Sequence, residues 1–335
     1  MNYPLATKVL IAAGLLTIAG LSASAQTTIF DDTFNNGSTV DSTAGTPTAD
    51  STTYEALSSR TVTTNPSITS GDFNINMTTT AGSLVEFEAQ FTSTPVTLAT
   101  VGNNIELNIT FTDTTGILTG SGYLATGLYN SGGAAPVSGG LIDGIDVAGT
   151  SGNNAGNAAG WQGYVGQIGS TGNNSMVNVR TTQSGSALNQ DQEALIGGSI
   201  SSSKGYDNPK SSTHFGQSTA PSVTLVGGDI YTESLLITLS GSSQLTVQNS
   251  LYSGAGTTGT LLSQFNSGAL TGANDPTSSF DSLAFGWYEI GNSATAADIS
   301  EIQVLNDVTV PEPSVLALGG AGLGLLGLIR FRRRS

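Results

Sequence analysis

The chain has no cysteine, a single histidine and little positive charge. Without cysteine it can form neither a disulfide framework nor a thiolate metal site. The one histidine is His214, so a two-histidine metal site is excluded and a Ser-His-Asp triad would depend on that residue alone. We therefore expect no cofactor and no bound metal.

Nine Lys and Arg stand against 24 Asp and Glu, which gives a formal net charge of −15. Most of the positive charge lies at the chain ends, and only Arg60, Arg180, Lys204 and Lys210 remain for the body. An acidic body repels phosphate backbones and anionic lipid surfaces. We expect no nucleic-acid partner.

The body also lacks long amphipathic helical stretches, whereas Gly, Ser, Thr and Asn are abundant. In Asn104–Thr112 the apolar residues alternate with polar ones, which is typical of a half-buried strand. The expected strands are Ser83–Phe91, Asn104–Thr112, Tyr123–Tyr129, Trp161–Ile168, Met176–Thr181, Ser222–Val226, Tyr231–Leu239, Gln244–Leu251, Thr258–Phe265, Phe280–Tyr288 and Asp298–Leu305. This pattern predicts one all-β domain over residues 26–309, built as a two-sheet antiparallel jelly-roll sandwich.

The first 25 residues have the parts of a cleavable secretory signal. Lys8 precedes the apolar run 9–21, and small residues follow it. Ala23 and Ala25 fit the small pockets of a signal peptidase, so we expect Gln26 to begin the mature chain.

Residues 310–335 carry a proline-containing motif, a short apolar run over about 315–329 and a basic end over 330–335. The motif is Val310, Pro311, Glu312 and Pro313, and the basic residues are Arg330, Arg332, Arg333 and Arg334. The apolar run is short for a hydrocarbon core of about 30 Å, but arginine side chains can snorkel to the interface. We therefore expect a single transmembrane helix in the inner membrane. By the positive-inside rule, the basic end stays in the cytoplasm and the body lies outside that membrane.

This ordered trio resembles the PEP-CTERM sorting tail. The resemblance implies recognition by an exosortase-type enzyme, cleavage near Pro311–Pro313 and delivery to the surface of a bacterium that makes exopolysaccharide and biofilm. The implied partners are a signal peptidase, the sorting enzyme, the inner membrane and exopolysaccharide. The alternative is a plain tail anchor that keeps the chain in the membrane.

Several body segments resemble the concanavalin A-like lectin/glucanase jelly rolls. They are Ile29–Phe34 (IFDDTF), Gly127–Gly133 (GLYNSGG), Gly160–Gly169 (GWQGYVGQIG) and Phe280–Trp287 (FDSLAFGW). The resemblance implies that Thr28–Phe34 lies beside Asp298–Leu305. That fold hosts sugar binders, glycosidases and inert modules, so it leaves function open.

Glu86 and Glu88 are the candidate carboxylate pair of a glycosidase, since their spacing puts both on one face of a strand. Laminarinase-like jelly rolls carry E-x-D-x-x-E in such a strand. Here the segment reads EFEAQF and lacks the Asp and the final Glu. We therefore expect that the chain is not an enzyme and that the two glutamates lie on a solvated face.

Trp161 and Trp287 are the candidate sugar contacts, because aromatic faces stack on sugar rings. Core packing is the alternative for these aromatic residues, and Trp161 and Tyr164 should point to opposite faces of their strand.

Asp31 and Asp32, or Asp143 and Asp146, could provide oxygen ligands for calcium, but no D-x-D-x-D-G loop is present. His214 is expected to be solvated in the polar loop 199–221.

Taken together, these features predict an exported, non-enzymatic protein. It would first be anchored in the inner membrane and then sorted to the cell surface or extracellular matrix. A carbohydrate-binding module and a polysaccharide hydrolase remain as alternatives.

Overall fold

The computed structural model describes residues 25–35, 54–58, 63–64, 66–69, 71–78, 83–115, 117, 122–134, 140–141, 160–169, 175–180, 195–196, 214–215, 223–272, 275–289 and 295–308. One compact unit covers Gln26–Val308. Within the described ranges, no helix is long and apolar enough to cross a membrane. The signal segment up to Ser24 and the whole of 310–335, with its predicted helix and sorting motif, lie outside these ranges.

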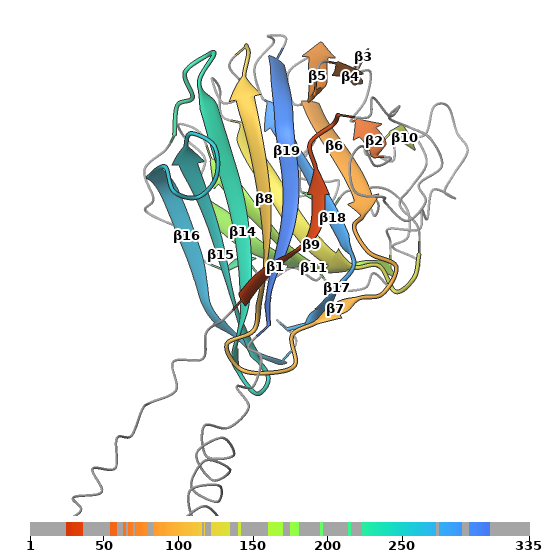
Figure 1. The fold of residues 1–335 in the computed structure, drawn as a ribbon, viewed down its shortest axis with the longest axis vertical. Coiled ribbons are helices and arrows are strands. Elements are labelled where there is room, and N and C mark those ends of the chain that lie inside the picture. The colour runs from red at the N-terminus through yellow and green to blue at the C-terminus, as the bar shows by residue number, and fades with distance from the viewer. Residues whose placement is uncertain are drawn as a thin grey trace, which may run out of the picture. The chain divides into compact units, whose positions relative to one another are not determined.

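Nine strands form the first sheet, called sheet A (Figure 1). In spatial order they are β16 (Thr260–Leu270), β15 (Gln244–Ser253), β14 (Ile230–Gly241), β8 (Asn104–Asp113), β19 (Thr295–Val308), β5 (Asp72–Thr78) and β3 (Thr63–Thr64), with β1 (Ala25–Asp32) beside β19 and β4 (Ser67–Thr69) beside β5. Neighbours run antiparallel from β16 to β3.

Eight strands form the second sheet, called sheet B, which lies behind sheet A in Figure 1. In order they are β10 (Gly140–Leu141), β2 (Glu55–Ser58), β6 (Ser83–Gln90), β18 (Ser282–Glu289), β9 (Tyr123–Asn130), β11 (Gln162–Gly169), β12 (Met176–Arg180) and β13 (His214–Phe215). The β10–β2 pair is parallel, and the others are antiparallel. A small pair, β17 (Ser279–Phe280) with β7 (Val96–Thr97), completes the described strands.

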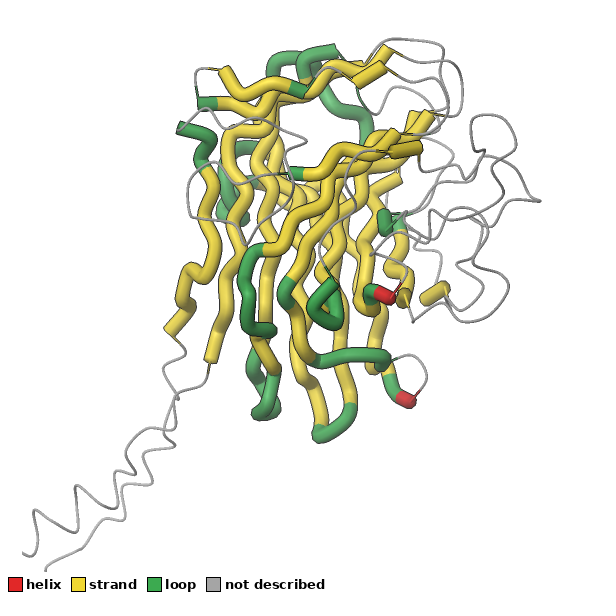
Figure 2. Tube along the Cα trace, turned by 90° about the vertical axis from the view of Figure 1, so that its right-hand side faces the viewer, coloured by secondary structure: helices red, strands yellow, loops and turns green. Residues whose placement is uncertain are grey.

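The two sheets stack as the layers of a sandwich, which the side view shows (Figure 2). A large apolar cluster draws on both sheets, with Leu107 and Leu235 from sheet A and Phe285 from sheet B. Phe73 of β5 meets Phe87 of β6 edge to face, with ring centroids 4.9 Å apart. The prediction of an all-β antiparallel sandwich is confirmed.

The alternation in β8 explains this layering. Ile105, Leu107 and Ile109 are buried in the cluster between the sheets, as their spacing predicts. The pairing of β1 with β19, which the jelly-roll resemblance implies for the first and last strands, is also confirmed.

Some element predictions were wrong. Residues 223–226 form no strand, although Ser222–Val226 has an apolar run. His214 lies in β13, where its backbone pairs with Asn178, rather than in a loop. The short run β5 was not predicted, because Asn74 and Asn76 are residues that strands ordinarily disfavour.

Candidate functional site

Glu86 and Glu88 lie on the outer face of sheet B. In β6 the side chains of Val85 and Phe87 point between the sheets, so the alternating glutamates point the other way. The prediction that the two acids share a face is confirmed. The expected solvation is wrong, because each glutamate has 0% of its surface exposed.

The residues that cover Glu86 are Leu195 and Ile196, which we call the strap. The backbone N–H of Leu195 donates to both carboxylate oxygens of Glu86, at 2.8 Å to Oε1 and 3.0 Å to Oε2. The N–H of Ile196 donates to Oε2 at 3.1 Å. Three backbone hydrogen bonds thus fasten the strap to a single carboxylate 109 residues earlier in the chain.

Sheet B also satisfies the carbonyl groups of the strap. The Tyr129 hydroxyl donates to the carbonyl oxygen of Leu195, and Nε2 of Gln167 donates to that of Ile196 at 3.0 Å. Unpaired backbone polar groups are costly when buried, so a buried strap needs such partners. All four polar backbone groups of the strap are therefore held by side chains of sheet B.

Apolar packing completes the attachment of the strap. Leu195 and Ile196 join a second apolar cluster, separate from the one between the sheets, which includes Leu84 and Trp161. Gly286 of β18 leaves space for the strap, because a Cβ there would lie 2.8 Å from Cδ1 of Ile196. The strap therefore lies close against the outer face of sheet B.

Burial raises the pKa of Glu86 to about 7. A hydrogen bond with Glu88, the strap N–H groups and the positive charge of Arg180 act in the opposite direction and lower it. Arg180 is itself buried at 3% exposure, and its Nε donates to the carbonyl oxygen of Trp161 at 3.2 Å. The outer face thus holds a buried group of two acids and one arginine.

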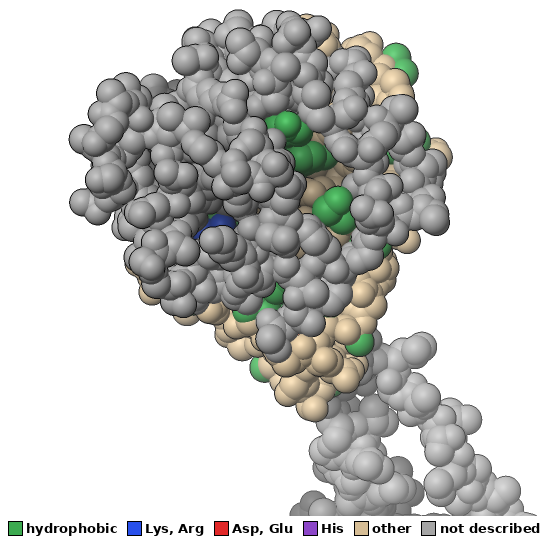
Figure 3. Space-filling model, turned by 180° about the vertical axis from the view of Figure 1, so that it is seen from behind, with side chains coloured by type: hydrophobic (Ala, Val, Ile, Leu, Met, Phe, Trp, Pro, Cys, Tyr) green, Lys and Arg blue, Asp and Glu red, His purple; other side chains and the backbone are tan. Residues whose placement is uncertain are grey.

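A hydrolase needs carboxylates that reach a substrate. Here the oxygens of Glu86 face backbone N–H groups of the strap, and Glu88 has no exposed surface. Seen from this side, the described surface shows apolar side chains and a positively charged group (Figure 3). In this conformation the carboxylate of Glu86 holds the strap.

Both candidate sugar-stacking residues are buried. Trp161 is 0% exposed in the outer cluster, and Trp287 is 2% exposed in the cluster between the sheets. Nε1 of Trp287 donates to Oγ1 of Thr295 at 3.0 Å. Tyr164 lies in the cluster between the sheets, so the prediction that it and Trp161 face opposite ways is confirmed. Neither indole presents a ring face to a saccharide, which corrects the sugar-contact prediction.

Glu233 is a second fully buried acid, which the sequence did not single out. It points between the sheets from β14, and Nδ2 of Asn249 donates to its Oε1 at 3.0 Å. Burial raises the pKa of Glu233 to about 8. Asn249 fits there because Gly166 faces it across the sandwich, where a Cβ would lie 2.2 Å from Cγ of Asn249. A small cavity of about 20 Å³ lies beside Glu233.

The remaining candidates do not come together as a site. Asp32 accepts hydrogen bonds from the N–H of Phe34 and the hydroxyl of Tyr54, each at 3.0 Å, so it connects the turn after β1 to Tyr54. No group of three or more possible metal ligands occurs among the residues that the structure describes. Asp143 and Asp146, like the sorting motif and the basic end, lie outside the described ranges.

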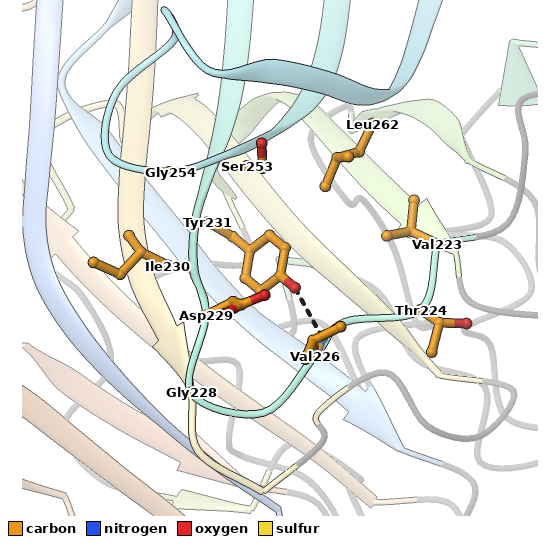
Figure 4. A pocket seen from close by; sticks show the side chains of 10 residues that line it. All are labelled: Val223, Thr224, Val226, Gly228, Asp229, Ile230, Tyr231, Ser253, Gly254 and Leu262. Atoms are coloured by element: carbon orange, nitrogen blue, oxygen red, sulfur yellow. Dashed lines mark hydrogen bonds between the residues drawn. The ribbon is translucent and has the colours of Figure 1, made fainter.

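An open pocket of about 740 Å³ lies where β14 begins and β15 ends (Figure 4). Tyr231 stands at its centre, and its hydroxyl accepts a hydrogen bond from the N–H of Val226 at 2.8 Å. Val223 and Leu262 also line the pocket, and both lie to the right of Tyr231 in this view. The lining holds one acid, Asp229, and is otherwise apolar or neutral.

No protein-family model matches the chain, and no curated protein matches it. Among solved structures it is similar to peanut lectin in complex with a 9-residue peptide (11% identity, TM-score 0.35), with 76% of this chain and 90% of that one covered. It is also similar to an endo-1,3-beta-glucanase from Streptomyces sioyaensis (12% identity, TM-score 0.38, coverage 84% and 96%). A third is a PL-14 alginate lyase from the marine Aplysia kurodai (10% identity, TM-score 0.37, coverage 72% and 86%). At such identities and TM-scores the likeness carries no argument about what this chain binds or catalyses.

Proposed function

We propose that this chain is an exported, non-enzymatic surface protein whose β-sandwich is delivered to the cell surface or extracellular matrix through its C-terminal sorting tail. The observation that carries the non-enzymatic part is the environment of Glu86. Its carboxylate accepts three backbone hydrogen bonds from the strap and has no exposed surface. A carboxylate used in this way supports a structural role.

The delivery part rests on the two terminal segments. The apolar run 9–21 with Ala23 and Ala25 supports export, and the motif at 310–313 with its basic end supports sorting by an exosortase-type enzyme. The acidic body agrees with a location away from nucleic acid. The lectin-like alternative would use a concave face lined by aromatic and Asn/Asp residues, and both of its candidate indoles are buried.

Delivery is tested by fractionation and intact-mass measurement in a host that has the sorting machinery. We expect the full chain to lose its tail near residues 311–313 and to reach the surface. Glu312→Ala and deletion of 330–335 should hold the chain in the membrane, whereas the neighbouring Ser314→Ala should be sorted normally. Full-length wild-type chain that stays uncut in the inner membrane would contradict the proposal.

The non-enzymatic part is tested with polysaccharide substrates and a reducing-sugar assay. We expect no release above that of heat-denatured chain. Release that disappears in both Glu86→Gln and Glu88→Gln, with folding preserved by circular dichroism, would make the acid pair catalytic and overturn this part.

A further inference from the structure

The described sheet edges differ greatly in length. Sheet B ends in β10 and β13, which have two residues each. On one side, sheet A ends in β3, which also has two residues, and in β1, which has eight and lies beside β19. Very short edge strands leave few unpaired backbone groups for another chain. The other side of sheet A ends in β16, which has eleven residues. Among the described edge strands, β16 is therefore the longest.

Charge does not protect this edge. Residues 244–270, which include β15 and β16, contain no Asp, Glu, Lys, Arg or Pro, in a chain whose net charge is −15. Natural edge strands commonly carry charges or proline that prevent pairing. Gln264 and Asn266 are exposed on β16, so the strand is accessible. This edge therefore lacks charge and proline as protection against a second strand.

An apolar patch extends from one end of this edge. The described residues include four exposed large hydrophobic side chains, and three of them are Val226 (59% exposed), Ile230 (46%) and Leu261 (46%). Val226 and Ile230 line the open pocket of Figure 4, and Leu261 precedes Leu262, which also lines it. Exposed apolar groups gathered in one place mark interaction surfaces.

We propose that β16 pairs antiparallel with β16 of a second copy of this chain, joining two sandwiches through sheet A. Two identical strands related by a twofold axis are self-complementary, and their backbone groups complete a hydrogen-bond ladder. The partner is a second copy because residues 244–270 let two acidic bodies meet without like-charge repulsion. This inference is independent of the proposed function.

The bulges of β16 determine where the twofold axis between the two copies can lie. The register between β15 and β16 shifts at Thr246/Gln248 and again at Leu251/Tyr252. Bulges bend a strand and disturb its ladder, so the regular stretch Ser263–Asn266 between them is the part suited to pairing. An axis through Phe265 places Gln264 of each copy opposite Asn266 of the other and brings Leu261 toward the Gly268–Leu270 end. The apolar patches then flank the central ladder on both sides.

The absence of cysteine gives a direct test on the full chain. Paired Cα atoms in an antiparallel ladder lie about 4.5–5.5 Å apart, within the span of a disulfide. We expect an equal mixture of Gln264→Cys and Asn266→Cys chains to form disulfide-linked heterodimers under mild oxidation. Ser93→Cys, exposed between β6 and β7, is the matched control and should cross-link to neither variant. Equal cross-linking in mixtures that contain Ser93→Cys, or none in the mixture of the 264 and 266 variants, would overturn the proposal.

A charge exchange tests the twofold axis itself. Gln264→Lys and Gln264→Glu each place like charges near one another in the dimer, so each should weaken self-association about tenfold in sedimentation experiments. An equal mixture of the two variants should restore association, whereas Ser93→Lys should leave it unchanged. A wild-type chain that stays monomeric up to its solubility limit, or a mixture that does not recover, counts against a second copy as the partner.

Discussion

The two faces of sheet B are both buried, yet they are covered by different kinds of structure. On the inner face, side chains of sheet A supply a mostly apolar cover, in which Glu233 and Asn249 hydrogen-bond to each other. On the outer face, the strap brings backbone N–H and carbonyl groups that need hydrogen-bond partners. The outer face accordingly carries buried polar side chains, which Glu86, Tyr129 and Gln167 supply. What covers a sheet thus determines which residues its face can hold.

The two buried glutamates show the same contrast. Glu86 and Glu233 are both fully buried, but the pKa of Glu86 rises to about 7 and that of Glu233 to about 8. Glu86 has strap N–H groups and Arg180 nearby, whereas Asn249 donates to Glu233 at 3.0 Å. More donors and a positive charge favour the ionised form. The outer face therefore supplies more groups that favour the ionised form than the inner face does.

The largest effect should come from cavities made in the two faces. Leu128→Ala on the inner face should lower the free energy of unfolding by about 4 kcal/mol, because two packed sheets cannot close the gap. Leu84→Ala on the outer face should cost about 2 kcal/mol, because a two-residue strap can settle into the space. Urea denaturation measures both. Equal losses would show that the strap is as rigid as sheet A.

Adding one methyl group under the strap should have the next largest effect. A Cβ at Gly286 would lie 2.0 Å from the carbonyl oxygen of Val85 and 2.8 Å from Cδ1 of Ile196. Gly286→Ala should therefore destabilise the fold by about 3 kcal/mol. In Gly227→Ala the nearest atom lies 3.9 Å from the new Cβ, so this variant is the control and should be nearly neutral. A stable Gly286→Ala chain would mean that β18 and the strap shift easily.

Glu86→Gln should loosen the strap without opening the sandwich. An amide keeps one acceptor oxygen but turns an NH₂ group toward the strap N–H groups, so about 2 kcal/mol should be lost. Hydrogen exchange at Leu195 and Ile196 should accelerate, while exchange in β8 stays slow. Glu88→Gln is the matched control, since the strap N–H groups donate to Glu86. Unchanged exchange at the strap would remove Glu86 as its anchor.

The smallest expected effect is a change in the free energy of unfolding with pH. The folded-state pKa values of Glu86 and Glu233 lie above their ordinary 4.5, so the folded chain binds more protons than the unfolded chain in this window. Their contribution is fully present below pH 4.5 and is lost as pH rises through about 7 and 8. Glu233→Gln should remove the upper part of this slope in denaturation series. Stability that rises over the same window in wild type would contradict the assignment.

Much of the sandwich could be predicted from alternation. The segment Asn104–Thr112 became β8 almost residue for residue, because its apolar side chains repeat every second position. The prediction of a strand at 223–226 was wrong. The N–H of Val223 donates to the carbonyl oxygen of Gly169 at the end of β11, at 3.4 Å, but the residues after it are not assigned to a strand. The shared face of Glu86 and Glu88 followed from their spacing alone. Their burial did not, since the strap comes from a non-periodic segment.

By itself, the sequence determined the properties that short stretches carry: strand alternation, the acidic charge, the absence of cysteine and the signal-like ends. The tertiary structure decided exposure, because period two tells which residues share a face and not what covers that face. Glu86 meets its strap across 109 residues, and Trp161 joins the same cluster beneath it. Contacts of that separation arise only when strands assemble into sheets, so the roles of both residues were settled by packing.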